Sequence, residues 1–155
     1  AAREGRLHRN FQGYTTDAAG TLLGLGASAI GALPQGFVQN ATHEMAWRKA
    51  VGAEDLPIAR GVERSLEDRF RGDLIERLMC DFEIDLAAVC ARHQRPMSQL
   101  ATAISSLRPF ERDGLVRREG DRLFVTQRGR ILVRSVCAVF DAYLTEDAPR
   151  HAKAI

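Results

Sequence analysis

The clearest pattern in the sequence is an apolar residue at every fourth position over residues 66–82. The series consists of Leu66, Phe70, Leu74, Leu78 and Phe82. This spacing places the apolar side chains on one side of a helix, so it predicts an amphipathic helix over this stretch. A shorter helix is predicted through Leu86, Val89 and Cys90. A third is predicted from Pro96, which suits a first helical turn, through Met97, Leu100, Ile104 and Leu107. Pro109 should end this third helix or distort its last turn.

A β-hairpin and a final helix follow. Leu115–Val116 and Leu123–Val125 are short apolar runs, and Gly120–Asp121 between them is suited to the turn. Thr126 is expected to cap the final helix. The apolar side of that helix would carry Leu132, Val136, Phe140 and Tyr143. Three helices, a hairpin and a terminal helix form the order of a winged-helix domain with one helix added.

The first third of the chain has a different pattern. Residues 22–30 are almost continuously apolar, which predicts a strand buried on both faces, as in a parallel sheet covered by helices. Gly24 and Gly26 weaken it as an independent strand, so a ligand or a neighbouring backbone is expected to approach there. A turn at 33–36 leads to a second strand at 37–40. Thr42 is then expected to cap a helix that ends near Gly52.

Length and composition narrow the class of protein. The 155 residues are enough for one sizeable core with a smaller appendage. A net charge of +2 gives no argument for binding nucleic acid or an anionic membrane. No apolar run reaches the roughly 20 residues that a membrane helix needs. Three widely spaced cysteines fit free thiols in a reducing cytosol.

The start of the chain also carries an expectation. It begins with Ala1 rather than methionine, and residues 1–9 make a poor beginning for an autonomous domain. We therefore expect the chain to be the C-terminal piece of a longer protein.

The familiar patterns of catalytic and metal sites are absent from the sequence. Gly24 and Gly26 lack the third glycine and helix start of a dinucleotide-binding fingerprint, and close packing against a flat ligand fits them better. Glycines needed only for sheet curvature are the alternative. The spacing of Cys80, Cys90 and Cys137 suits neither a zinc finger nor an iron–sulfur cluster. The four histidines form no metal-binding pair. We therefore predict no catalytic residue and no metal ligand in this stretch.

Phe11 and Gln12 are the residues best suited to contact a ligand. An amide in an apolar pocket donates and accepts hydrogen bonds, which suits a carboxylate or the polar groups of a cofactor. A phenyl ring offers a face for a tetrapyrrole or an adenine. A core phenylalanine beside a self-satisfied glutamine explains the same residues without a ligand.

The winged-helix order raises a rival function, a free-standing module that binds nucleic acid or another partner. Arg117, Arg118 and Arg122 on the hairpin would face the phosphates. Glu119 and Asp121 interrupt them, which makes a poor phosphate-binding strip. A solvated face is the better interpretation, and no nucleic acid is expected as a partner.

Several motifs resemble one known family. The most specific are Asn-Phe-Gln-Gly-Tyr-Thr-Thr at 10–16 and Gly-Arg-Ile-Leu-Val-Arg at 129–134. Others in the same register are Phe-Val-Gln-Asn at 37–40 and Asp-Gly-Leu-Val at 113–116. Together they cover nearly the whole chain and closely resemble the oxygen-independent coproporphyrinogen III oxidases, radical S-adenosylmethionine enzymes of haem biosynthesis.

The resemblance implies a reaction that this chain does not perform alone. In the family, a [4Fe–4S] cluster reduces S-adenosylmethionine to a 5′-deoxyadenosyl radical, which abstracts hydrogen from propionate side chains. Two oxidative decarboxylations turn coproporphyrinogen III into protoporphyrinogen IX, with an electron donor as a further partner. The family's cluster motif, Cys-x-x-x-Cys-x-x-Cys, is absent here. The resemblance therefore implies an N-terminal barrel elsewhere in the same protein and an inactive isolated fragment. The cysteine usage and the lack of a long apolar run lead us to expect a cytoplasmic location and no membrane partner.

The resemblance also assigns domains and site residues. It implies an α+β, mainly α, chain: the end of a partial (β/α) barrel at 1–55, a winged-helix-like helical domain at 56–147 and a tail at 148–155. Ile30 resembles a wall residue of the S-adenosylmethionine cavity. Phe11 and Gln12 resemble pocket residues close to substrate or cofactor.

Overall fold

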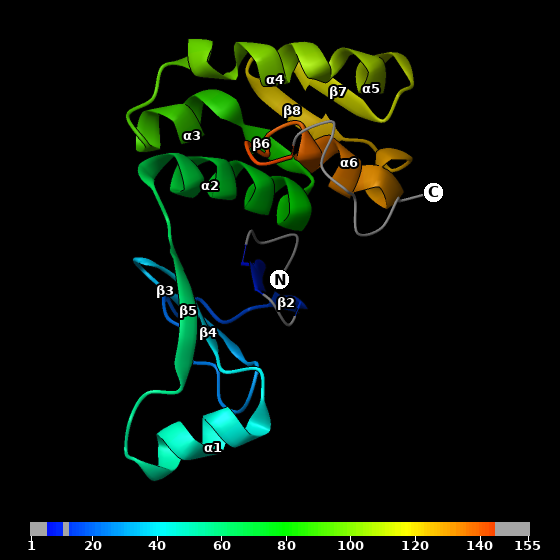
Figure 1. The fold of residues 1–155 in the computed structure, drawn as a ribbon. Helices are drawn as coiled ribbons and strands as arrows, with labels where there is room; N and C mark the ends of the chain where they lie inside the picture. Colours follow the sequence, from blue (N-terminus) through cyan, green and yellow to red (C-terminus); the bar gives the residue numbers. More distant parts are fainter. Residues whose placement is uncertain (1–5, 11–12, 145–155) are drawn as a thin grey trace. The chain divides into compact units, whose positions relative to one another are not determined.

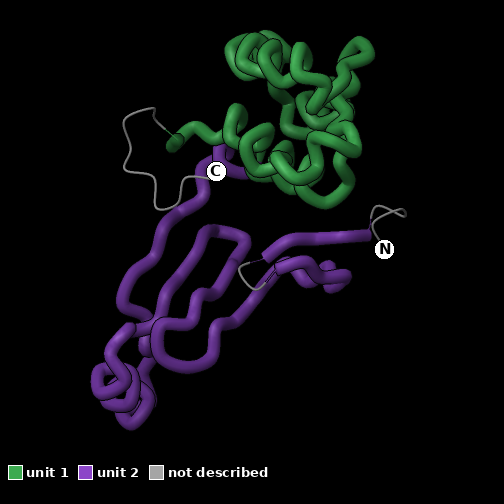
Figure 2. The backbone as a smooth tube through the Cα atoms, turned by 90° about the vertical axis from the view of Figure 1, so that its right-hand side faces the viewer, with its two compact units in different colours: residues 1–5, 70–155 green, residues 6–69 purple. Residues whose placement is uncertain are grey.

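The fold mixes helices and antiparallel sheets in two compact units. The computed structural model describes residues 6–10 and 13–144. One unit consists of residues 6–69 and the other starts at Phe70, so the division falls inside a helix. Residues 6–69 come first in the chain and form the first unit, drawn in purple in Figure 2 (unit 2 of its key); the unit that starts at Phe70 is the second unit, drawn in green (unit 1 of its key). This content confirms the α+β class.

The first unit is built mainly from short antiparallel strands (Figure 1). Its elements are β1 (His8–Asn10), β2 (Gly13–Thr15), β3 (Ile30–Leu33), β4 (Gly36–Asn40), α1 (Glu44–Gly52) and β5 (Ile58–Glu63). β1 pairs with β2, and β3, β4 and β5 form a three-stranded sheet in that order. β4 is therefore the central strand. The predicted strand at 37–40 is confirmed, and the turn before it joins the hairpin in which Leu33 pairs with Gly36.

The strand predicted at residues 22–30 is wrong. Within it, only Leu22 makes a bridge, to Ala32, and Ile30 begins β3. Leu23 is 70% exposed and Leu25 is 91% exposed, so this run is not buried on both faces. The segment is a loop that turns back on itself, and the sheet beside it is antiparallel rather than parallel.

The predicted cap of the helix at α1 is also wrong. The helix begins one residue later than a Thr42 cap requires, with His43 at the N-cap and no side-chain cap hydrogen bond. None of the residues of α1 is buried.

The second unit contains the apolar core. Its elements are α2 (Leu66–Asp81, which begins in the first unit), β6 (Glu83–Asp85), α3 (Leu86–Arg92), η2 (Met97–Leu100), α4 (Ala101–Ser106), α5 (Arg108–Arg112), β7 (Val116–Glu119), β8 (Arg122–Val125), η3 (Gly129–Leu132) and α6 (Val133–Ala138). β8 lies between β6 and β7, and both pairings are antiparallel. The predicted helices at α2 and α3 and the hairpin of β7 and β8 are confirmed. The third helix divides into η2 and α4, and ends before Pro109 as predicted.

One side of α2 supplies the centre of this core. Phe70, Leu74 and Leu78 are fully buried at the predicted spacing. Leu86, Leu100, Leu107, Leu123, Val136 and Phe140 are also fully buried and come from the other elements. Burial of a large apolar side chain stabilises by roughly 1.5–3 kcal/mol, so these contacts hold the unit together.

Side chains and hydrogen bonds set the ends of two helices. Ser65 and Asp68 form a capping box at the start of α2: the Asp68 amide donates to Ser65 Oγ, and the Ser65 amide donates to Asp68 Oδ2. The final helix is shorter than predicted, since the 3₁₀ turn η3 precedes it and α6 ends at Ala138. The predicted cap at Thr126 is wrong: Arg128 is the N-cap of η3 and makes no side-chain cap hydrogen bond, although Thr126 Oγ1 accepts from the Gly129 amide at 3.1 Å. Arg71 Nη1 donates to the Phe140 carbonyl just beyond α6, at 3.0 Å.

Gly129 is required by a close approach between two backbones. A Cβ atom at this position would lie 1.9 Å from the Leu115 carbonyl oxygen. We expect Gly129→Ala to lower the free energy of unfolding by about 3 kcal/mol, because a backbone atom cannot turn away as a flexible side chain can. Urea unfolding followed by circular dichroism measures this change.

Gly52→Ala is the control, since nothing lies within 4 Å of a Cβ at the end of α1. Alanine is the better helix former, so this variant should stay within about 1 kcal/mol of the wild type. Equal effects of the two substitutions would contradict the packing at Gly129.

Candidate functional site

The loop of residues 22–30 brings apolar side chains around a hollow beside the first residue of β3. Leu22 and Ala32 exchange two backbone hydrogen bonds of 2.8 Å, which close the base of the loop. A Cβ at Gly24 would lie 2.9 Å from the Ile30 carbonyl carbon and oxygen. Glycine at this position therefore lets the backbone at residue 24 pass directly against the backbone of Ile30.

The turn at the end of the loop needs left-handed backbone conformations. Gly26 has a φ of +100° and Ser28 a φ of +59°. Glycine adopts such angles at little cost, whereas serine adopts them only where its surroundings hold it. The Ser28 amide donates to the Ala41 carbonyl at 2.9 Å, which ties the turn to the chain just after β4.

Two amide side chains at the end of β4 bind carbonyl groups of the loop. Asn40 Nδ2 donates to the carbonyls of Gly24 and Gly26, at 3.0 and 2.9 Å. Gln39 Nε2 donates to the Ser28 carbonyl at 3.0 Å. The sequence predicts both residues as part of a strand and carries no signal of this role, because their partners lie elsewhere in the chain.

The hollow has the size of a small-ligand site. Its volume is about 550 Å³, within the range of roughly 300–1,000 Å³ typical of ligand pockets. It is lined by Leu22, Leu23, Gly24, Leu25, Ser28, Ala29 and Ile30. This lining offers packing surface and backbone polar groups but no ionisable side chain, so it can bind a ligand and cannot by itself perform acid–base chemistry.

The structure places one of the three predicted site residues in this hollow. Ile30 is half-buried, lines the hollow and pairs with Gln39 across the sheet. Phe11 and Gln12 lie outside the described residues. Tyr14, which belongs to the same Asn-Phe-Gln-Gly-Tyr-Thr-Thr motif, is on β2 and is 53% exposed.

The described residues do not fit an iron–sulfur cluster. Cys80, Cys90 and Cys137 are each buried, and none of them forms a disulfide. Burial raises the pKa of the Cys90 thiol, and Asp121 adds to the rise, so this residue is less readily a thiolate ligand. Across residues 6–10 and 13–144, no three His, Cys, Asp or Glu residues group in a way that could hold a metal ion.

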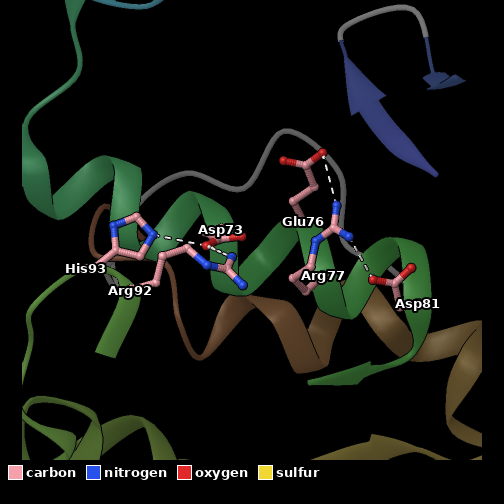
Figure 3. A network of polar contacts seen from close by, with 6 residues as sticks. All are labelled: Asp73, Glu76, Arg77, Asp81, Arg92 and His93. Atoms are coloured by element: carbon pink, nitrogen blue, oxygen red, sulfur yellow. Dashed lines mark hydrogen bonds and ion pairs between the residues drawn. The ribbon is translucent and has the colours of Figure 1, made fainter. Parts of the chain in front are cut away.

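A network of partly buried polar side chains follows α2 (Figure 3). Asp73 Oδ2 accepts from Arg92 Nη1 at 2.7 Å and lies 3.0 Å from His93 Nε2. Farther along the helix, Arg77 pairs with Asp81 at 3.0 Å. The two contacts of Asp73 join α2 to the end of α3, and the Arg77–Asp81 pair lies within α2, so we assign them a structural role.

The arginines of the hairpin are held by carboxylates and by an aromatic ring. Arg117 pairs with Glu119, and Arg118 Nε lies 3.3 Å from Glu111. The guanidinium groups of Arg117 and Arg122 lie 4.6 and 5.1 Å from the centre of the Phe124 ring. The carboxylates offset part of the positive charge that a phosphate-binding wing would need.

Membrane insertion through a helix finds no support in the part of the chain that the structure describes. None of its helices combines the length and the apolar character needed to cross a bilayer.

Comparison with known proteins identifies the type of domain and then the family. Residues 65–132 match the family model described as the HemN C-terminal domain. A solved structure of coproporphyrinogen III oxidase (HemN) from Escherichia coli, described as a radical SAM enzyme, is similar to this chain with a TM-score of 0.88 and 36% sequence identity. The similarity covers 93% of this chain and 33% of that one.

Curated relatives agree with this match. The oxygen-independent coproporphyrinogen III oxidase of Bradyrhizobium diazoefficiens is 48% identical over the whole chain and 34% of its own length. That of Synechocystis is 41% identical over 93% of this chain and 32% of its own length. The chain thus spans about a third of the length of the relatives it matches. It is homologous to the C-terminal portion of the oxygen-independent coproporphyrinogen III oxidases, as its motifs predicted.

We expect Asp81 to make the stability of the second unit depend on pH. Burial raises the pKa of its carboxyl group above 3.8, Glu83 adds to the rise and Arg77 opposes it. The folded state therefore binds this proton more tightly than the unfolded state does, and the stabilisation it gives is lost as the pH rises through the raised pKa. We expect the stability of the wild type relative to Asp81→Asn to fall as the pH rises from about 3 to 7.

Urea unfolding of both proteins at a series of pH values measures this difference. The comparison removes the contribution of the other carboxyl groups, which both proteins share. A difference that is constant with pH, or that grows as the pH rises, would show that burial does not dominate at Asp81.

Proposed function

We propose that this chain is the C-terminal part of a radical S-adenosylmethionine enzyme that converts coproporphyrinogen III to protoporphyrinogen IX by oxidative decarboxylation of two propionates. The observation that carries the proposal is a 48% identity to a curated oxidase along all 155 residues. A TM-score of 0.88 to a solved enzyme of the same kind supports it. A free-standing winged-helix module is not favoured, since the match extends well beyond the helical part.

In the proposal, this chain and the rest of the protein bind different cofactors. S-adenosylmethionine and a [4Fe–4S] cluster together supply the radical that starts the reaction. The described cysteines are buried and far apart in sequence, so the cluster would be bound by the N-terminal barrel and not by this chain. The hollow of residues 22–30 fits the role of a wall against S-adenosylmethionine.

In the proposal, the residues of that wall and the two predicted pocket residues, Phe11 and Gln12, bind the ligand and do not react with it. Ile30 would give packing surface to the cofactor, and Gly24 would let the backbone lie close beside it. Phe11 and Gln12 would contact the substrate or the cofactor through a ring face and an amide. No described side chain here is suited to move a proton, so the chain would bind and orient rather than react.

The proposal assigns residues 1–55 to the end of a partial (β/α) barrel and 56–147 to a winged-helix-like domain, followed by the tail. The order α2, β6, α3, α4, β7, β8, with β8 paired to both other strands, supports the second assignment. This domain would cover the barrel opening and exclude water from a reactive radical. The proposed protein works in the cytoplasm with an electron donor, without nucleic acid or a membrane.

The test is an anaerobic assay of the full-length gene product with coproporphyrinogen III, S-adenosylmethionine and a reductant. We expect protoporphyrinogen IX to form, and the 155-residue chain alone to be inactive. In the full-length protein, Ile30→Ala should lower kcat/KM at least about tenfold, because it removes packing surface from the cofactor wall.

Ile131→Ala is the matched control. Ile131 is 90% exposed and lies in η3, so the same substitution there should leave the activity unchanged. No conversion by a folded, reconstituted wild type would exclude the proposed function. Full activity of Ile30→Ala would exclude only the assignment of this residue to the wall.

A further inference from the structure

Asn40 is unusual because its polar side chain is buried. Among the residues that the structure describes, it is the only polar or charged one that is buried, with 8% of its surface exposed. Burying an amide is costly unless its hydrogen bonds are made. Its Nδ2 group meets this requirement with two carbonyls of the same loop, those of Gly24 and Gly26.

These two hydrogen bonds act on the part of the loop that lines the hollow. Gly24 lies against Ile30, and Gly26 has the positive φ that turns the chain. With only one residue between them, the two carbonyls bound by one amide group fix the local path of the backbone. The position of Leu25 follows from this path, since it lies between the two bound residues and lines the hollow.

Asn40 is well placed to hold the loop firmly. It ends β4, the strand that pairs with both β3 and β5. Its backbone amide also donates to the Ala29 carbonyl at 3.0 Å. Gln39 assists from the neighbouring position, and Arg60 on β5 donates to Gln39 Oε1 at 2.7 Å, which orients that amide.

We propose that Asn40 is a positioning residue: it sets the shape of the loop of residues 22–30 and thereby the affinity for S-adenosylmethionine. This inference rests on the proposed function and extends it to a residue that does not line the hollow. Asn40 would act through Gly24 and Gly26, without a contact of its own to the cofactor. Its loss should therefore weaken cofactor binding more than it slows turnover at saturating cofactor.

The test uses Asn40→Asp in the full-length protein. The carboxylate keeps the size of the side chain, removes both donated hydrogens and places an oxygen against the two carbonyls. We expect hydrogen exchange at the Ser28 and Ala29 amides, both hydrogen-bonded in the native loop, to speed up about tenfold or more. We expect the KM for S-adenosylmethionine to rise about tenfold, with a smaller change in kcat.

Thr126→Val is the control for a loss of stability alone. It removes the hydroxyl that donates to the Gly114 carbonyl and accepts from the Gly129 amide, all in the second unit. It should leave the loop's exchange and the KM for S-adenosylmethionine unchanged. Asn40→Ser, which can donate only one hydrogen, replaces Asn40→Asp if that variant does not fold, and should give a smaller change of the same kind.

The outcomes separate this inference from the proposed function. If the wild type is active but the Asn40 variant shows unchanged hydrogen exchange in the loop, or an unchanged KM for S-adenosylmethionine, the positioning role is overturned. The proposed function is unaffected by that result. The positioning role is also overturned if Thr126→Val raises the KM for S-adenosylmethionine as much as the Asn40 variant does. A reconstituted wild type that does not turn over coproporphyrinogen III removes the proposed function, and the positioning role with it.

Discussion

The proposed cofactor wall depends on one constraint, the reversal of the backbone between Leu22 and Ile30. The reversal needs a residue without a side chain at Gly24, because a Cβ there would meet the Ile30 backbone at 2.9 Å. It also needs donors for the carbonyls that the reversal turns inward, and the amide of Asn40 supplies two. The lack of a side chain at Gly24 and the hydrogen bonds of Asn40 therefore fix the backbone path of the same short segment. The hollow beside Ile30 results from that path.

The second unit is stabilised in a different way. Its order comes from a contiguous apolar core to which α2 contributes Phe70, Leu74 and Leu78. Charged residues along α2 are paired as well: Arg77 pairs with Asp81, both largely buried, and Asp73 pairs with the more exposed Arg92. Within residues 70–144 no group of His, Cys, Asp or Glu residues could hold a metal ion, and a packed core of this kind suits the covering role proposed for the unit.

The sequence predicted the second unit better than the first because its signals were periodic. A series with a spacing of four residues specifies which side of α2 is buried, and glycine and aspartate specify the turn between β7 and β8. Residues 22–30 carry no such period. A short apolar run with two glycines fits a buried strand and a tight loop equally well, and the structure shows the loop. The role of Asn40 could not be predicted, since its partners lie 14 and 16 residues away and depend on the path of that loop.

The central claim is that residues 22–30 form a wall of the S-adenosylmethionine site. The most direct measurement is a crystal structure of the full-length protein, reconstituted and crystallised without oxygen in the presence of S-adenosylmethionine. The account predicts electron density for the cofactor in van der Waals contact with Ile30, with the Asn40 amide still bound to the carbonyls of Gly24 and Gly26. Cofactor density that is remote from residues 22–30 would contradict it.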